Sequence, residues 1–380
     1  CMKKIFMPTL TFLFFFAFSI TSYANDINEN QYPTDEQASS YALHFMQTSQ
    51  EDSSIEIDDF VRLYGTDGMI TGYYITFQKD GQPAGYTLLS LVSGEDPLVE
   101  FSFESNGVLG EQLEQEMQAN SMDETIESSE QRIIYNGAGL LYKPLSNGEY
   151  YSVYEGKNVS ISDTEASAVN ATIGGGIIDW SDANLNTNSI YKIPLFGYGT
   201  DYWIMTDFSS GGVCYPTAAT NILWYWGNNC GRTSVMNNSR ISGATTLWAK
   251  AQAIFGLVHQ GMLTVDSSGT FDFMITNGYA NFFGVSASST GVWNYKKISK
   301  NSAYSEYKAA LNGQCPIHLV LHTKAGTILR GEGHGVYCFG YASSNTGVNY
   351  LFVMDGWNRG GRFVKFNYYP QVFGYKIYVR

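Results

Sequence analysis

The chain has 380 residues, of which 44% are hydrophobic and 15% are charged. This composition excludes global disorder, because enough apolar side chains are present to bury a large core, and the length suggests two domains or one domain with appendages. The formal net charge is −13, and the basic residues are scattered, which argues against a nucleic-acid-binding protein.

Residues 1–24 have the features of a secretory signal peptide. Lys3 and Lys4 precede an apolar stretch at 10–20, and Ser22-Tyr23-Ala24 offers a cleavage site. The apolar stretch is short for a membrane span. We therefore expect a secreted protein, extracellular or periplasmic, without stable membrane association.

Acidic and basic residues divide unequally along the chain. Residues 1–170 hold 7 Lys+Arg and 26 Asp+Glu, a net charge of −19, whereas residues 171–380 hold 15 and 9, a net charge of +6. Opposite charges favour docking of the two halves on each other. We predict an acidic domain at 25–160, a linker at 161–189 that is accessible to proteolysis, and a second domain at 190–380.

The hydrophobic pattern predicts elements of both kinds in each half. In the first half it predicts a helix over 34–50, strands over 60–64, 69–77, 84–91 and 99–103, and a weak helix over 113–130. In the second half it predicts helices over 215–226, 245–255, 270–283 and 302–311, then strands over 316–322, 334–341, 349–355, 362–367 and 371–379. Helices followed by consecutive strands favour an α+β domain, in which a helix packs on an antiparallel sheet.

Cys214 is the candidate nucleophile. Gly211 and Gly212 precede it, and an apolar helical run at 221–226 follows it, so the thiol is expected in the first turn of a helix. The unpaired N–H groups and the positive dipole end of a helix favour the thiolate, which is the reactive form of cysteine.

His334 is the candidate base for this thiol. Glycines at 331, 333 and 335 surround it at the head of a strand, where they let another backbone approach closely. His318 and His322 share a strand face, but no third ligand of matching context stands nearby, so we expect no metal and no cofactor. His44 is interpreted as structural, and His259 as a cation at the C-terminus of a helix.

Asp355 ends an apolar strand, where a carboxylate is costly to bury unless it is paired. An imidazole N–H is a natural partner, so Asp355 is expected to orient His334. Trp357 is expected to shield this contact from water. Asn358 is a competing orienting residue, and the alternative is that Asp355 simply begins a turn with Gly356.

The remaining cysteines leave two interpretations open. In an exported protein, Cys214, Cys230, Cys315 and Cys338 could form two disulfides. Cys315 and Cys338 instead read as small buried residues of strands. A Cys214–Cys230 bridge would exclude a thiol enzyme.

These motifs together resemble the papain-like cysteine peptidases, among them streptopain and the double-glycine leader peptidases. The resemblance is carried by Cys214-Tyr215-Pro216-Thr217-Ala218-Ala219, by Gly333-His334-Gly335-Val336 with Gly340-Tyr341, and by Asp355-Gly356-Trp357-Asn358. It extends over most of residues 200–365. Gly85-Tyr86-Thr87-Leu88-Leu89-Ser90 in the acidic half is similar to a streptopain-type propeptide.

The resemblance implies a papain-like catalytic domain preceded by a smaller α+β prodomain, which acts as an intramolecular inhibitor and is removed on maturation. It implies hydrolysis of protein or peptide substrates by Cys214, His334 and Asp355. The family's glutamine before the cysteine has no counterpart between Lys192 and Cys214. Ser209, Ser210 or Thr206 are then the candidate oxyanion donors, with the Cys214 N–H.

Two other functions fit the same residues. One is a cell-wall amidase or acyl transferase that uses the same cysteine and histidine. The other is a catalytically inactive secreted binding protein or protease inhibitor, which the missing glutamine favours.

Overall fold

The computed structural model describes residues 33–91, 97–120, 132–145, 147–154, 156–161, 185, 187–194, 202–209, 211–286, 291–299, 302–323, 333–357 and 359–380, with the side chains of 116–120 left out. The predicted signal peptide, nearly all of the predicted linker, Ser210 and Asn358 lie outside these residues. The predictions made for them therefore stay predictions.

The first half begins with the helix that the sequence predicts and continues as a strand meander. Thr34 caps helix α1 (Asp35–Ser49): its side chain accepts from the Gln37 N–H, and the Gln37 side chain accepts from the Thr34 N–H. The other elements are strands β1 (Glu56–Tyr64), β2 (Ile70–Lys79), β3 (Gln82–Ser90), β4 (Leu98–Ser102), β5 (Ile133–Tyr135), β6 (Leu141–Pro144), β7 (Tyr150–Ser152) and β8 (Lys157–Val159), and helix α2 (Gly107–Asn120).

The second half places its larger helices before most of its strands. The helices are α4 (Cys214–Trp224), α5 (Thr233–Met236), α6 (Leu247–Gly261), α7 (Ile275–Phe283) and α8 (Tyr304–Asn312). Short helical turns lie at Thr187–Ser189, Met205–Asp207, Tyr225–Asn229, Ser239–Ile241 and Asp272–Met274. The strands are β9 (Tyr191–Lys192), β10 (Trp293–Ile298), β11 (Ile317–His322), β12 (Gly333–Ser343), β13 (Asn349–Met354), β14 (Arg362–Lys365) and β15 (Gln371–Val379).

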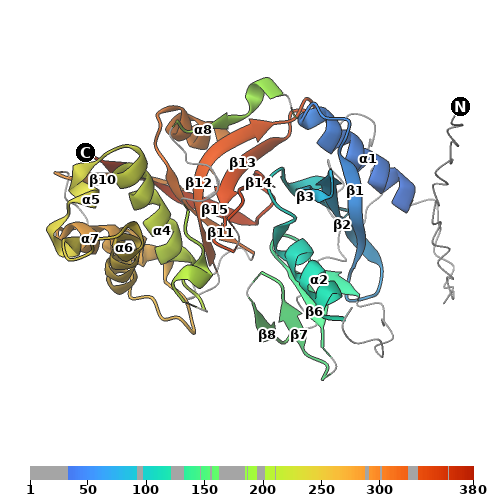
Figure 1. Ribbon diagram of the computed structural model, residues 1–380, viewed down its shortest axis with the longest axis horizontal. Coiled ribbons are helices and arrows are strands. Elements are labelled where there is room, and N and C mark those ends of the chain that lie inside the picture. Colours follow the sequence, from blue (N-terminus) through green and yellow to red (C-terminus); the bar gives the residue numbers. More distant parts are fainter. Residues whose placement is uncertain are drawn as a thin grey trace, which may run out of the picture. The chain divides into compact units, whose positions relative to one another are not determined.

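All the described strands belong to one sheet. Its order is β10-β15-β11-β12-β13-β14-β4-β3-β2-β1-β5-β6-β7-β8, with β9 beside β12. Among these strands the pairing is antiparallel except between β1 and β5. Helix α4 packs against β11 and β12, and α6 and α7 pack on α4, as Figure 1 shows on the side where α4 is labelled. The fold is therefore of the α+β class that the sequence predicts.

The two halves join at strands β4 and β14. Phe363 pairs with Phe101, and Val364 pairs with Glu100. The rings of Phe101 and Phe363 stack at 4.7 Å, and the Ser102 hydroxyl donates to the Gly361 carbonyl at 2.7 Å. Residues Thr34–Arg380 form one compact unit, so the predicted division between an N-terminal domain and a catalytic domain does not interrupt the sheet.

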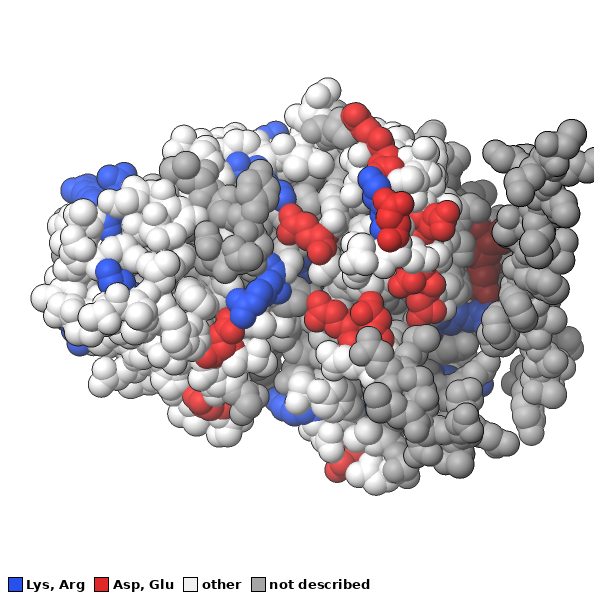
Figure 2. Space-filling model, viewed as in Figure 1, with Lys and Arg blue, Asp and Glu red and all other residues white. Residues whose placement is uncertain are grey.

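The charges follow the division that the sequence predicts. Figure 2 shows acidic side chains gathered, on the face in view, over the part where Figure 1 draws α2 and β1–β3. Among the described residues, ion pairs between Lys192 and Glu104 and between Arg362 and Glu100 join the halves. In both pairs the acid comes from the first half and the base from the second.

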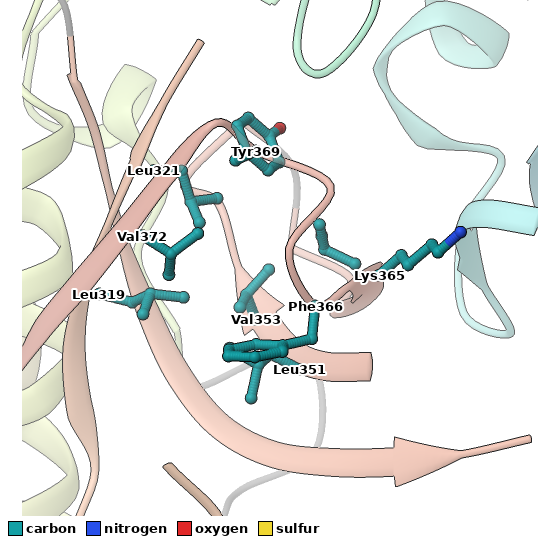
Figure 3. A pocket seen from close by; sticks show the side chains of 9 residues that line it. Leu319, Leu321, Leu351, Val353, Lys365, Phe366, Tyr369 and Val372 are labelled. Atoms are coloured by element: carbon teal, nitrogen blue, oxygen red, sulfur yellow. The ribbon is translucent and has the colours of Figure 1, made fainter. Parts of the chain in front are cut away.

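A small cavity lies between the sheet of the second half and the turn before β15. Figure 3 shows that mainly apolar side chains line it, including Leu319, Leu351, Val353 and Tyr369. None of the candidate catalytic residues lines this cavity. It is therefore a packing gap of the core and not a substrate site.

No disulfide joins the four described cysteines. Cys315 and Cys338 are buried, and burial raises the pKa of each of these two thiols to about 12. They are packing residues, as the second of the two interpretations predicts. In the part of the chain that the structure describes, no helix is long and apolar enough to cross a membrane.

Candidate active site

Cys214 is the first residue of helix α4, as the sequence predicts. The residues after it in α4 are buried, while Cys214 itself is only partly buried. The thiol therefore stands at a helix N-terminus on an accessible edge, where the local field favours a thiolate.

Tyr215 brings this helix against the strand that carries His334. A Cβ placed on Gly335 would lie 3.0 Å from the Cα of Tyr215 and 2.9 Å from its Cγ. A Cβ placed on Gly333 would lie 2.3 Å from the Tyr215 hydroxyl. The two glycines are therefore required because the tyrosine crosses directly over them. Since Cys214 precedes Tyr215 and His334 lies between the glycines, the candidate nucleophile and base are on neighbouring backbones.

The hydrogen bond of His334 defines its tautomer. Its Nε2 lies 2.8 Å from the main-chain carbonyl oxygen of Asp355. A carbonyl can only accept, so Nε2 carries the proton and Nδ1 is left with a lone pair. Burial, together with the positive charge of Arg362, lowers the pKa of His334 to about 3, against the opposing effect of this hydrogen bond. The imidazole is thus neutral at pH 7, and its Nδ1 lone pair is available to accept a proton.

Trp357 covers the imidazole. The two rings are parallel within 3°, with centroids 3.9 Å apart. Gly356 has a φ of 83°, a left-handed conformation that favours glycine, and this turn carries the chain back so that Trp357 lies over His334. The shielding that the sequence predicts for Trp357 is consistent with this geometry.

The Asp355 carboxylate is directed to partners other than His334, which differs from the prediction. Oδ1 accepts from the Trp357 N–H at 2.8 Å, and Oδ2 lies 2.9 Å from Arg362 Nε. The contact to the imidazole comes from the main chain of Asp355. The physical reason is charge: a buried carboxylate is stabilised more by a guanidinium than by a neutral ring.

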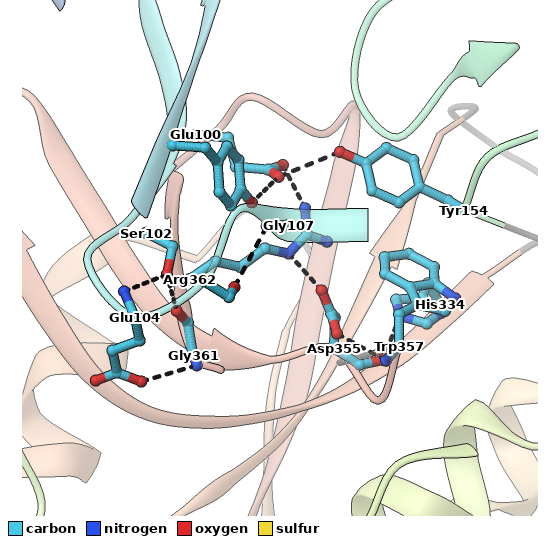
Figure 4. Close-up of polar contacts among 12 residues, drawn as sticks. Glu100, Ser102, Glu104, Gly107, Tyr154, His334, Asp355, Trp357, Gly361 and Arg362 are labelled. Atoms are coloured by element: carbon cyan, nitrogen blue, oxygen red, sulfur yellow. Dashed lines mark hydrogen bonds and ion pairs between the residues drawn. The ribbon is translucent and has the colours of Figure 1, made fainter. Parts of the chain in front are cut away.

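Arg362 links this carboxylate to one from the first half. It also forms an ion pair with Glu100, whose Oε1 accepts from the hydroxyls of Tyr86 at 2.5 Å and Tyr154 at 3.2 Å. Glu100, Asp355 and Arg362 are all at most 3% exposed. Figure 4 shows this chain of contacts running from Glu100 through Arg362 to Asp355, with His334 and Trp357 beside it.

The first half also contacts the tryptophan that covers His334. The ring of Tyr154 lies 4.7 Å from that of Trp357, and Trp357 packs on the hydrophobic core cluster of the first half. Glu100, Tyr154 and Arg362 were missed by sequence reasoning. The one available signal was a charge inside each of two apolar strands, which suggests a buried pair without identifying it.

The candidate oxyanion donors differ in placement. The Ser209 hydroxyl donates to Asp266 at 2.5 Å, so its proton is already engaged, which does not fit the predicted support role. Ser210 and Asn358 lie outside the described residues. The segment that carries Thr206 is nevertheless held at the site, because the Met205 N–H donates to the Gly356 carbonyl at 2.7 Å.

Enlarging Gly335 tests the helix–strand contact. We expect Gly335→Ala to slow alkylation of Cys214 by iodoacetamide about tenfold, because the added methyl group pushes Tyr215, and the nucleophile with it, away from the histidine strand. The rate is measured by mass spectrometry at pH 6. The control is Gly256→Ala in helix α6, where a Cβ meets nothing within 4 Å. An unchanged rate in Gly335→Ala would contradict the inferred juxtaposition.

His318 provides a pH test of the core. It is fully buried, its Nδ1 lies 3.1 Å from the Tyr279 hydroxyl, and burial lowers its pKa to about 3. The unfolded chain binds a proton near pH 6.5 and the folded chain does not, so stability falls as the pH drops from about 6.5 towards 3, by up to about 1.4 kcal/mol per pH unit. His318→Asn should reduce this slope in urea unfolding between pH 7 and pH 5. Equal slopes in the variant and the wild type would refute the prediction.

Comparisons with known proteins find a distant structural similarity and no match in sequence. No family model and no curated protein matches the chain. Among solved structures, a mutant fragment of prointerpain A from Prevotella intermedia is similar: it is 14% identical, with a TM-score of 0.40, and the match covers 83% of this chain and 97% of that one. These comparisons assign the chain to no family. The function is therefore argued from the residues of the site.

Proposed function

We propose that this protein is a cysteine peptidase made as a zymogen, with Cys214 as nucleophile and His334 as base. The observation that carries the proposal is the close approach of Tyr215 to Gly335, because it brings Cys214 at a helix N-terminus next to the histidine strand. A thiol, a neutral imidazole and a fixed hydrogen bond on the far ring nitrogen are the components of nucleophilic catalysis by cysteine.

The reaction divides into two halves. Nδ1 of His334 takes the proton of the Cys214 thiol, and the sulfur attacks the peptide carbonyl carbon to form a C–S bond and an oxyanion. When the intermediate collapses, the C–N bond breaks and the imidazolium donates its proton to the leaving amine. Water, deprotonated by the same imidazole, then hydrolyses the thioester and regenerates the thiol.

Asp355 and Trp357 hold the imidazole during these steps. The Asp355 carbonyl accepts from Nε2 and keeps Nδ1 available as the base. Stacked on the ring, Trp357 restricts its rotation and reduces access of water to the hydrogen bond. We propose that the Cys214 N–H is one oxyanion donor, since it lies at the start of α4.

The zymogen part of the proposal is supported by the contacts of the first half. Tyr154 packs on Trp357, and Glu100 shares Arg362 with Asp355, so the first half reaches the residues that hold the imidazole. We propose that it restrains the site until the chain is cut in the 161–189 region. Secretion, predicted from residues 1–24, belongs to the same proposal.

The test compares residues 25–380 with the Cys214→Ala variant. Both are incubated at neutral pH under mildly reducing conditions with a denatured, fluorescently labelled protein, and mass spectrometry follows the chain itself. The proposal requires that only the native protein releases labelled peptides and is cut between 161 and 189. Hydrolysis of peptidoglycan but not of protein would indicate the amidase. An inert Cys214, with neither activity, would indicate a binding protein.

A further inference from the structure

A second buried polar cluster lies at the hydroxyl end of Tyr215. The Tyr215 hydroxyl donates to Asp272 Oδ1 at 2.6 Å, and Asp272 Oδ2 lies 2.9 Å from His322 Nε2. The three residues come from helix α4, from the short helical turn Asp272–Met274 and from the end of strand β11. The mechanism above uses none of these side chains.

The three side chains of this cluster are buried, and burying a carboxylate has a cost in folding free energy. His322 is fully buried, and Asp272 is only 9% exposed. A carboxylate in such surroundings destabilises a fold unless its oxygens are bonded, and here one oxygen serves Tyr215 and the other serves His322. Moving the Tyr215 hydroxyl would break its hydrogen bond to the buried Asp272 carboxylate, and this cost holds the hydroxyl in place.

The cluster also determines where the tyrosine ring lies. With its hydroxyl fixed on Asp272, the ring extends along the Gly333-His334-Gly335 segment, and both glycines touch it. His322 pairs with Gly333 in the sheet, so the same cluster is attached to the strand that carries His334. The Asp272 carboxylate therefore binds Tyr215, the neighbour of Cys214, directly. Through His322 it is also linked to Gly333, the neighbour of His334.

We propose that Asp272, through its hydrogen bond to Tyr215, is a positioning residue that sets the distance between Cys214 and His334. The proposal rests on the peptidase function proposed above. Asp272 and Tyr215 act through the backbone of α4 and do not contact substrate. Their effect is therefore expected on the chemical step rather than on substrate binding.

The chain offers a matched control for this bond. Tyr279 is also fully buried, and its hydroxyl contacts a buried histidine, His318, which lies four residues before His322 in strand β11. Tyr279→Phe therefore removes the hydroxyl of another buried, hydrogen-bonded tyrosine, but at a tyrosine that does not adjoin Cys214. A merely structural role for Tyr215 would make the two substitutions equivalent.

The experiment measures alkylation of Cys214 by iodoacetamide at pH 6 in the uncut chain, and kcat and KM for peptide hydrolysis after the chain has been cut between 161 and 189. We expect Tyr215→Phe to lower the alkylation rate and kcat about tenfold with KM within about twofold. Tyr279→Phe should leave all three within about twofold, while both variants lower the urea midpoint. The proposal is overturned if Tyr215→Phe leaves the rates unchanged, or if Tyr279→Phe lowers them equally.

A double-mutant cycle tests the route through Asp272. If Tyr215 acts through that carboxylate, Tyr215→Phe combined with Asp272→Asn should be no slower than the slower single variant, whereas additive losses would overturn the route. If Asp272→Asn does not fold, the proposal is tested by the comparison of Tyr215→Phe with Tyr279→Phe alone.

The failure of the two proposals can be told apart. If Cys214 of the wild type is alkylated faster than a free cysteine but the protein hydrolyses no peptide, the peptidase function is wrong. The alkylation rates of Tyr215→Phe and Tyr279→Phe then still test the positioning role. A wild type that is alkylated no faster than a free cysteine, both before and after the chain is cut, would overturn both.

Discussion

His334→Ala is expected to lower peptide hydrolysis by about 10⁴-fold or more, with Cys214 still present. The reason is that the variant loses both the acceptor for the thiol proton and the donor for the leaving amine. It should also slow alkylation of Cys214 at pH 6, because no imidazole is left to accept the thiol proton. Hydrolysis is measured on the cut, mature protein with a fluorogenic peptide. The exposed His44→Ala in helix α1 is the control and should retain full activity.

Asp355→Asn separates the predicted orienting role of the carboxylate from the one seen in the structure. A carboxylate that holds the catalytic histidine is worth about 10⁴-fold in kcat where it has been removed. Here the main-chain carbonyl makes the contact, and it survives the substitution. We expect a loss of kcat of no more than about tenfold, which is the size of a modest positioning effect. A loss of kcat as large as that of His334→Ala would show that the Asp355 carboxylate orients His334, as the sequence predicts.

Arg362→Met should destabilise the fold by about 3–5 kcal/mol, the cost of removing one partner of a buried ion pair. Arg362 neutralises Glu100 and Asp355 together, and all three side chains are shielded from water, so the substitution leaves two buried carboxylates without their cation. Methionine keeps much of the apolar contact with the rings of Tyr154 and Trp357. Urea unfolding at pH 7 gives the free energy of unfolding.

Two controls test whether charge is the cause. Lys192→Met removes the other ion pair between the halves, but its side chain is 31% exposed and that of Glu104 is 38% exposed, so the expected cost is below about 1 kcal/mol. The triple variant Glu100→Gln, Arg362→Met, Asp355→Asn removes all three charges and should be more stable than Arg362→Met alone. Equal losses in the triple and the single variant would mean that packing, not charge, explains the effect.

Local patterns predicted much of the fold and part of the candidate site. The helix beginning at Cys214, the strand carrying His334 and the strand ending before Asp355 each follow from residues close in sequence. Strand β10 was missed, because Trp293–Ile298 contains polar residues and pairs with the distant strand β15. The parallel pairing of β1 with β5 was missed for the same reason: it depends on a partner about 70 residues away.

The electrostatic part of the site could not be predicted in this way. Glu100 lies between Val99 and Phe101, and strand alternation alone would place a charged residue at that position on the solvent face. It can be buried because Arg362, 262 positions later, forms an ion pair with it. Whether Asp355 offers its carboxylate or its carbonyl to His334 depends on the same arginine, since Arg362 binds the carboxylate.

The pairing of β4 with β14 has a consequence for purification. A protease that cuts the chain between 161 and 189 breaks one covalent connection, but the hydrogen bonds, stacked rings and buried charges between these strands remain. We therefore expect the two fragments to elute together from a sizing column and to separate only in denaturant. Cleavage of the chain and dissociation of its fragments would then be distinct events. Two bands on a denaturing gel would show that the chain is cut, but not that the N-terminal half has dissociated.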